Sequence, residues 1–167
     1  MSEEFEWEAL LPADLDSVNK IADCVHTTLQ ERPEVFEEKL ILYPKGCRKL
    51  VSGKHAVGYG ISHPWTLYSI PPLDTFLKAL PPKPECLYIH DVVVLPDARG
   101  HGAAARYVDY IKSLAREAGI LSLALVSVYG TDVLWSRFGF RVIVTPDLSA
   151  KLISYGASAG YMVCDLR

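Results

Sequence analysis

The feature that most constrains this chain is an apolar run followed by a glycine-containing turn and an amphipathic pattern, within residues 86–119. Residues 86–95 read CLYIHDVVVL, a short run rich in β-branched side chains that is typical of a strand buried on both faces. Apolar residues then recur at helical spacing from Ala104 to Ala118, before Gly119, which predicts a helix over 102–118. We therefore expect a central strand, a turn and a helix packed on the sheet.

The rest of the chain alternates between helical and strand patterns. Strands are predicted at 5–11, 47–52, 55–63, 121–128, 140–144 and 161–166, and helices at 13–29, 33–42 and 131–138, the last capped by Thr131. The proline-rich segment 66–84 is expected to be a long excursion with a short helix at 73–80. The order predicts one domain over residues 1–167, an α/β fold whose mixed sheet carries helices on both faces.

Composition and charge exclude several classes of function. The net charge of −3 and the lack of a basic run argue against nucleic-acid binding. No apolar run approaches membrane-spanning length, and the acidic N-terminus lacks the pattern of a signal peptide, so a cytoplasmic protein is expected. The cysteines are not spaced as metal ligands or redox pairs, and no two histidines are, so no metal site is predicted and the thiols are expected to be reduced.

The turn at 96–104 has the composition of an anion site. A helix that starts there presents unpaired N–H groups, Gly100 and Gly102 allow close approach to the backbone, and Arg99 supplies a charge. The glycines alone are equally consistent with a simple chain turn. Residues 100–105 also satisfy the dinucleotide pattern GxGxxA, but the turn lies five residues beyond Val94 and no acidic residue ends the next strand. These departures argue against dinucleotide binding.

Two motifs resemble the GNAT acyltransferase superfamily. Arg99, Gly102 and Ala104 match its Q/R-x-x-G-x-G/A signature, and LWSRFGF at 134–140 is similar to its aromatic-rich helix ending in Gly-Phe. The resemblance extends over nearly the whole chain. SHPW at 62–65 and YIHDVVV at 88–94 further resemble the arylalkylamine (serotonin-type) N-acetyltransferase branch.

The resemblance implies a mostly antiparallel sheet in which the central strand splays from its neighbour. It also implies acetyl-CoA as co-substrate, with its thioester between strands 86–95 and 121–128. Backbone groups of the central strand are expected to pair with the pantetheine arm, the turn to hold the pyrophosphate, and an aromatic side chain to lie near the thioester. The cofactor-binding residues so implied are Val92, Val93, Val94, Arg99, Gly100, His101, Gly102, Ala103, Ala104 and Trp135.

Catalysis requires a base, because a primary alkylamine has a pKa of roughly 10.4 and is protonated at neutral pH. His90 is the candidate base, since it matches one of the branch's two catalytic histidines and imidazole titrates near neutrality. Tyr88 stands where the branch has its second histidine, and a relay through Tyr88 and water is the expected substitute. Asp91 is expected to point to the opposite face of the strand and not to orient His90.

The reaction also requires a proton donor for the coenzyme A thiolate that departs, and the sequence does not single out one residue for this role. The family's general-acid tyrosine is replaced by Trp135, whose indole N–H does not deliver a proton at working pH. Tyr129 is the candidate substitute, although a packed aromatic at a strand end is an alternative for it. Solvent and the ammonium formed during the reaction are the other possible proton donors. His26, His55, His63 and His101 are expected to have surface or structural roles.

The leading hypothesis is an acetyl-CoA-dependent N-acetyltransferase that acts on a small primary amine, with an arylalkylamine as one option. The alternative is a coenzyme A-binding protein with little or no transferase activity, which Trp135 motivates. A dinucleotide oxidoreductase is the third hypothesis. The sequence leaves the amine and the oligomeric state open.

Overall fold

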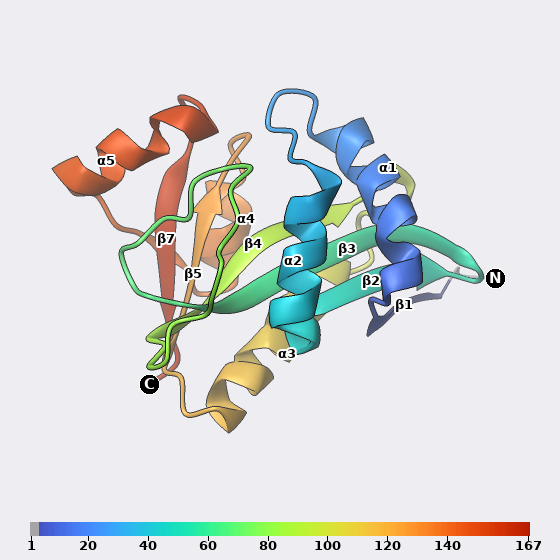
Figure 1. The fold of residues 1–167 in the computed structure, drawn as a ribbon, viewed down its shortest axis with the longest axis horizontal. Coiled ribbons are helices and arrows are strands. Elements are labelled where there is room, and N and C mark those ends of the chain that lie inside the picture. The colour runs from blue at the N-terminus through green and yellow to red at the C-terminus, as the bar shows by residue number, and fades with distance from the viewer. Residues whose placement is uncertain (1–3) are drawn as a thin grey trace.

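A computed structural model describes residues 4–167 and contains a seven-stranded sheet in the order β1-β2-β3-β4-β5-β7-β6 (Figure 1). Neighbouring strands are antiparallel except β4 and β5, which are parallel. The mixed, mostly antiparallel sheet predicted above is therefore confirmed. The strands are β1 (Phe5–Ala9), β2 (Cys47–Ser52), β3 (His55–Trp65), β4 (Cys86–Val94), β5 (Ser122–Ser127), β6 (Arg141–Val142) and β7 (Gly160–Asp165).

Helices cover both faces of the sheet. Figure 1 shows α1 and α2 side by side across β3, where buried α1 and α2 side chains pack with those of β2 and β3. On the other face α3 and Trp135 of α4 pack against β4, β5 and β7. The helices are α1 (Leu15–Val25), α2 (Pro33–Leu42), α3 (Ala103–Glu117), α4 (Asp132–Arg137) and α5 (Pro146–Leu152), with 3-10 turns at Pro12–Asp14, Pro44–Gly46, Pro96–Ala98 and Ile153–Tyr155.

Three helical predictions need correction. The first helix ends at Val25 rather than near residue 29, because His26 leaves the helical conformation at φ −94 and ψ 77. No helix forms at 73–80, where Asp74 and Lys78 have positive φ and the N–H of Leu77 donates to Glu38 instead of to a helical carbonyl. Thr131 occupies the N-cap position immediately before α4, as predicted, but its hydroxyl makes no cap bond to that helix.

The chain from 145 to 152 contains a helix that the sequence analysis did not predict. Pro146 occupies the first turn of α5, and the Thr145 hydroxyl accepts a hydrogen bond from the N–H of Leu148 at 3.1 Å. Both are ordinary helix-start signals. The strand predicted at 140–144 is correspondingly short, being reduced to Arg141 and Val142.

Strand β4 departs from its parallel neighbour after a short contact. It pairs with β5 only from Leu87 to Ile89, opposite Leu123 to Leu125, although β4 continues to Val94. The splayed central pair that the resemblance implied is therefore present. The remaining edge of β4 that faces β5 has no strand partner in the described chain, and this opening creates room for a ligand.

A β-bulge interrupts β4 at His90. On β3, Ile61 pairs with Asp91 and the adjacent Ser62 pairs with Ile89, so His90 is the extra residue. The bulge reverses the alternation of side chains that follows it. His90 and Asp91 therefore point to the same side of the sheet, where they contact Glu31 and His26, and the expectation that Asp91 points to the opposite face is wrong.

Within residues 4–167, no helix is long and apolar enough to cross a membrane. The same residues contain no cluster of three or more His, Cys, Asp or Glu side chains suited to a metal ion. All four cysteines are free, with Cys47, Cys86 and Cys164 buried and Cys24 exposed.

Candidate functional site

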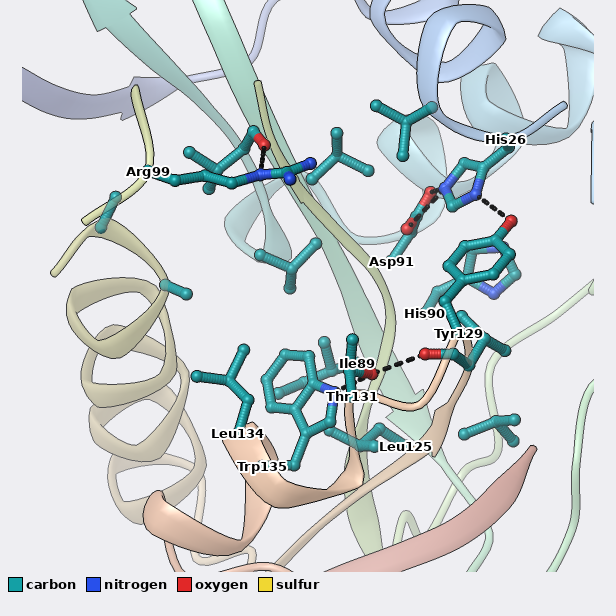
Figure 2. A pocket seen from close by; sticks show the side chains of 18 of the residues that line it. His26, Ile89, His90, Asp91, Arg99, Leu125, Tyr129, Thr131, Leu134 and Trp135 are labelled. Carbon is teal, nitrogen blue, oxygen red and sulfur yellow. Dashed lines mark hydrogen bonds and ion pairs between the residues drawn. The ribbon is translucent and has the colours of Figure 1, made fainter. Parts of the chain in front are cut away.

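A cavity of about 700 Å³ lies where β4 and β5 separate (Figure 2). One end is formed by the turn before α3 and the first residues of that helix. The other end is formed by the C-terminal part of α1, the following loop, and Leu73 from the 66–85 segment. The two ends belong to one continuous space, so a ligand held by the turn can reach the polar side chains at the far end.

Backbone groups build the first end. Gly100 and Gly102 have φ of 83 and 73, a conformation that favours glycine. The first hydrogen bond of α3 is donated by the N–H of Arg106 to the carbonyl of Gly102, at 3.1 Å. Within the described chain the N–H groups of Ala103, Ala104 and Ala105 have no backbone or side-chain acceptor, and all three residues line the cavity. Such a helix start, with no Cβ on its glycines, fits a diphosphate.

Arg99 fixes the position of this turn relative to β4. Its Nε donates to the carbonyl of Val94 at 2.8 Å, and its exposed guanidinium lines the cavity. Val92, Val93 and Val94 line the cavity along the free edge of β4. Of the ten residues predicted to bind the cofactor, only His101 lies outside the cavity wall, because its ring packs against Phe5 at 4.7 Å.

Trp135 forms an apolar wall in the middle of the cavity. It packs edge-on against Phe138 and Phe140, is 8% exposed, and lines the cavity together with Ile89 and Leu125. Its Nε1–H donates to the hydroxyl of Thr131 at 3.2 Å (Figure 2). The indole donor is therefore already engaged.

A buried histidine–carboxylate pair lies at the far end. His90 Nε2 is 2.7 Å from Glu31 Oε1, and the side chains are 3% and 6% exposed. Burial alone would raise the pKa of Glu31, but the charge and hydrogen bond of His90, together with the N–H of Asp74, lower it to about 2. Nδ1 of His90 is buried without a partner in the described chain. With Nε2–H donating to Glu31, the neutral ring carries its free lone pair on Nδ1.

A second histidine–carboxylate pair lies beside the first. His26, the residue that ends α1, places Nε2 2.9 Å from Asp91 Oδ2 and Nδ1 2.8 Å from the hydroxyl of Tyr129 (Figure 2). The hydroxyl of Tyr59 donates to Asp91 Oδ2 at 2.6 Å. Burial would lower the pKa of His26, but the hydrogen bond and charge of Asp91, with the charge of Glu31, raise it. Asp91 thus serves His26 and not His90.

Tyr88 and His63 lie behind the cavity wall. Tyr88 is 1% exposed, packs in a cluster with buried side chains of β5 and β7, and does not line the cavity, although its neighbour Tyr155 does. His63 on β3 lies next to it, with ring centroids 5.5 Å apart. Burial, with the charges of His90 and Lys39, lowers the pKa of His63 to about 3 despite its hydrogen bond to the Pro64 carbonyl, so this ring is neutral at physiological pH.

Sequence reasoning placed His90, Tyr129 and Trp135 in the cavity region but missed Glu31 and His26. Glu31 belongs to an irregular loop, and no spacing rule connects it to a strand 59 residues away. The helix predicted over 13–29 includes His26, and this hides the change of direction that turns the His26 ring toward Asp91. A hint was available, since neither HTT nor the following LQER continues the apolar pattern of α1.

The sequence from 16 to 140 matches the family model described as the acetyltransferase (GNAT) family, which is more than half of the chain. No curated protein sequence matches this chain significantly. The structural relatives below are under 25% identical, and their likeness concerns the fold.

Ard1 from Thermoplasma volcanium is similar with a TM-score of 0.72 and 18% identity, covering 98% of both chains. The loading GNATL domain of CurA from Lyngbya majuscula gives 0.74 and 13% identity, also covering 98% of each chain. Naa50 from Arabidopsis thaliana, solved with a bisubstrate analogue of coenzyme A and a peptide, gives 0.70 and 12% identity, covering 95% of this chain and 96% of its own. These relatives share the overall fold of this chain.

Proposed function

Because this chain belongs to the GNAT acetyltransferase family, we propose that it transfers an acetyl group from acetyl-CoA to a small primary amine. The observation that carries the proposal is the single cavity that joins the glycine turn before α3 to the polar side chains around His90. The turn and the free edge of β4 are proposed to hold the pyrophosphate and the pantetheine arm. The thioester then supplies the activated acetyl group, next to Trp135.

His90 is the proposed general base. It is oriented by Glu31 through Nε2, so the neutral ring has Nδ1 available to accept a proton from the amine, directly or through one water. Glu31 also accepts the N–H of Asp74 at 2.9 Å, which fixes its carboxylate. The Tyr88 relay predicted from the sequence has less support, because Tyr88 lies outside the cavity wall.

The chemistry of the far end favours an amine with an apolar body. Val25, Leu29, Leu73 and Val128 contribute apolar walls there. Both carboxylates at this end are already paired with histidines, so neither is free to bind a second ammonium of a polyamine. An arylalkylamine or a simple alkylamine suits these walls better than a polyamine does.

The test is incubation with acetyl-CoA and a panel of amines, with measurement of the released coenzyme A thiol. We expect turnover with arylalkylamines or alkylamines, and absence of turnover with every amine would refute the proposal. His90→Ala should lower the rate by about 10²-fold near neutral pH and by less at high pH, where the amine is already neutral. His55→Ala, on an exposed hairpin, is the matched control. An equal loss at every pH would contradict the base role of His90.

A second candidate is a coenzyme A-binding protein without transferase activity. The observation behind it is Trp135, which occupies the family's acid position and whose N–H is bonded to Thr131. Coenzyme A would then raise the melting temperature by linkage, while no amine would release thiol. The amine panel separates the two candidates directly.

A further inference from the structure

Asp91, His26 and Tyr129 form a hydrogen-bonded chain that ends in the cavity, and His90 takes no part in it. The three residues come from β4, the end of α1 and the loop after β5, and Figure 2 shows them in sequence. His26 uses both ring nitrogens, one toward each neighbour. The side chains of His26 and Asp91 are 12% and 13% exposed, so the pair is shielded from water. In an array of carboxylate, imidazole and hydroxyl, a proton can move between the imidazole and the hydroxyl while the carboxylate orients the ring and stabilises its charged form.

The hydrogen bonds have a definite direction. Asp91 already accepts from the hydroxyl of Tyr59, and as a carboxylate it accepts from His26, so Nε2 of His26 carries a hydrogen. When His26 is doubly protonated, Nδ1 also donates, and the Tyr129 oxygen is the acceptor. The phenolic proton of Tyr129 is then free to be donated elsewhere. Burial, with the charge of Asp91, raises the pKa of Tyr129, so its hydroxyl is protonated at neutral pH.

Tyr129 is held in a conformation that its own backbone disfavours. Its φ is 57, and it is followed by Gly130 with φ 74. A non-glycine residue in this region costs roughly 1 kcal/mol and persists only where its surroundings fix it. The side chain is 49% exposed, so core packing does not explain the conformation. What the conformation achieves is to place the hydroxyl against His26 at the cavity wall.

We propose that Tyr129 is the catalytic residue that protonates the departing thiolate, and that His26, held by Asp91, is the positioning residue that replaces the proton. This inference rests on the proposed function. It fills the gap left by Trp135, whose N–H is bonded to Thr131 and is no acid at working pH. The protein would thus use one histidine–carboxylate pair, His90 and Glu31, to remove protons from the amine, and the other, His26 and Asp91, to supply the proton that the thiolate takes.

The protons and bonds balance as follows. The amine nitrogen forms a bond to the acetyl carbon, the carbon–sulfur bond breaks, and its electron pair leaves on sulfur. Sulfur takes the phenolic proton of Tyr129, and the Tyr129 oxygen takes the Nδ1 proton of His26. Two protons leave the substrate ammonium by way of His90, and His26 takes one back from solvent. One proton is released for each acetyl group transferred.

The proposal predicts how acetyl transfer depends on the leaving group. With acetyl-CoA, Tyr129→Phe and His26→Gln should each lower kcat by about 10²-fold, and the double variant should fall little further because the two act as one unit. With an acetyl thioester of an acidic aryl thiol, which needs no proton to depart, each variant should come within about threefold of the unmodified protein. A purely structural role predicts equal losses with both donors, and that result would overturn the proposal.

Tyr68→Phe is the matched control. Tyr68 is also exposed and also has a positive φ, of 62, but it does not line the cavity. It should leave both rates unchanged. Coenzyme A affinity, measured by calorimetry, should be the same in all variants, which verifies that they fold. Absence of turnover in the unmodified protein would refute the proposed function itself, whereas full activity in Tyr129→Phe would refute only the relay.

A readout without any acetyl donor tests the pairing. The groups that face His26 are Asp91 from β4, Tyr129 after β5, Glu31 from the α1–α2 loop, and Tyr59 from β3 through Asp91. Titration of the His26 imidazole by NMR should give a pKa above 6.5, which Asp91→Asn should lower. In a plot of kcat against pH, kcat should fall at alkaline pH as His26 loses its proton. Tyr129→Phe should abolish this fall. A pKa that Asp91→Asn leaves unchanged would contradict the pairing.

Discussion

The two ends of the cavity are built in different ways. The end at the turn before α3 uses backbone: left-handed glycines, unpaired N–H groups, and the free edge of a strand. The far end uses side chains drawn from α1, the α1–α2 loop, β3, β4 and the loop after β5. The first end is local in sequence, within residues 92–105. The second is assembled from residues up to about a hundred positions apart.

This difference determines how each end responds to change. A backbone site has no titrating group of its own, so pH affects it weakly, and it is broken by altering chain conformation. A side-chain site of two histidine–carboxylate pairs depends on the protonation state of each member, so loss of one histidine leaves a buried carboxylate without its partner. Four substitutions test this contrast.

Glu31→Gln should have the largest effect, and it should depend on pH. The pKa of Glu31 falls from 4.5 to about 2 on folding, which corresponds to about 3 kcal/mol of stability above pH 4.5, lost as the pH falls toward 2. The variant should therefore be about 3 kcal/mol less stable at pH 6 and about half as much less stable at pH 3, as measured by urea unfolding. Exposed Glu37→Gln is the control. A deficit that stays constant between these pH values would argue against the ion pair.

Gly102→Val tests the backbone end. A β-branched residue at φ 73 is strained by about 2 kcal/mol, and distortion of the turn should weaken coenzyme A binding by roughly 30-fold. Gly53→Val is the matched control, since Gly53 has φ 61 at a hairpin tip with no atom near the added Cβ. Both variants should lose similar stability, but only the first should lose affinity in calorimetry. Equal affinities would mean that the turn does not hold the cofactor.

Arg99→Ala should weaken coenzyme A binding about tenfold, or about 1.4 kcal/mol, because one charge-assisted contact to the diphosphate is lost. The difference should shrink as salt is added, since the guanidinium is exposed. Arg106→Ala, on the exposed side of α3, should change affinity little. A loss that salt does not reduce would indicate that Arg99 acts by fixing Val94.

Trp135→Phe should have the smallest effect, a loss of about 1 kcal/mol of stability from its bond to Thr131. We expect less than a twofold change in the rate of acetyl transfer, because the ring acts as a wall and not as an acid. Trp65→Phe is the control, since the Trp65 indole N–H is buried without a partner in the described chain and its removal costs no bond. A large rate loss in Trp135→Phe would assign the indole a role in the reaction.

The sequence predicted the backbone end better than the side-chain end, for a physical reason. Gly100, Gly102 and Arg99 lie together in the chain, and the strand and helix that flank them have clear apolar periods. The pairing of His90 with Glu31 depends instead on how a loop of irregular structure crosses the sheet. No local period encodes that crossing, and the same holds for the meeting of His26 with Tyr129.

The helix predicted at 73–80 does not form, because tertiary contacts outweigh the helix propensity of this segment. LDTFLKAL has helical composition, but the carboxylate of Glu38 takes the N–H groups of Leu77 and Lys78, and Arg32 holds Asp74. This irregular segment is therefore stabilised by side chains of α2 and of the residue before that helix, and not by helical hydrogen bonds of its own. By contrast, α5 forms although it was not predicted from the sequence. Its start signals, Thr145 and Pro146, are local and visible in the sequence.

The bulge at His90 sets which face every later residue of β4 presents. Before it, Ile89 packs with α3, and after it Val92 does so while Val93 packs with α1 and α2. Deleting His90 would restore regular pairing, because Ile89 and Asp91 already lie opposite the adjacent β3 residues Ser62 and Ile61, so Asp91 and Val93 would keep the faces they present now. Aligned relatives without the extra residue can therefore share the pairing of Asp91 with His26, but not the pairing of His90 with Glu31.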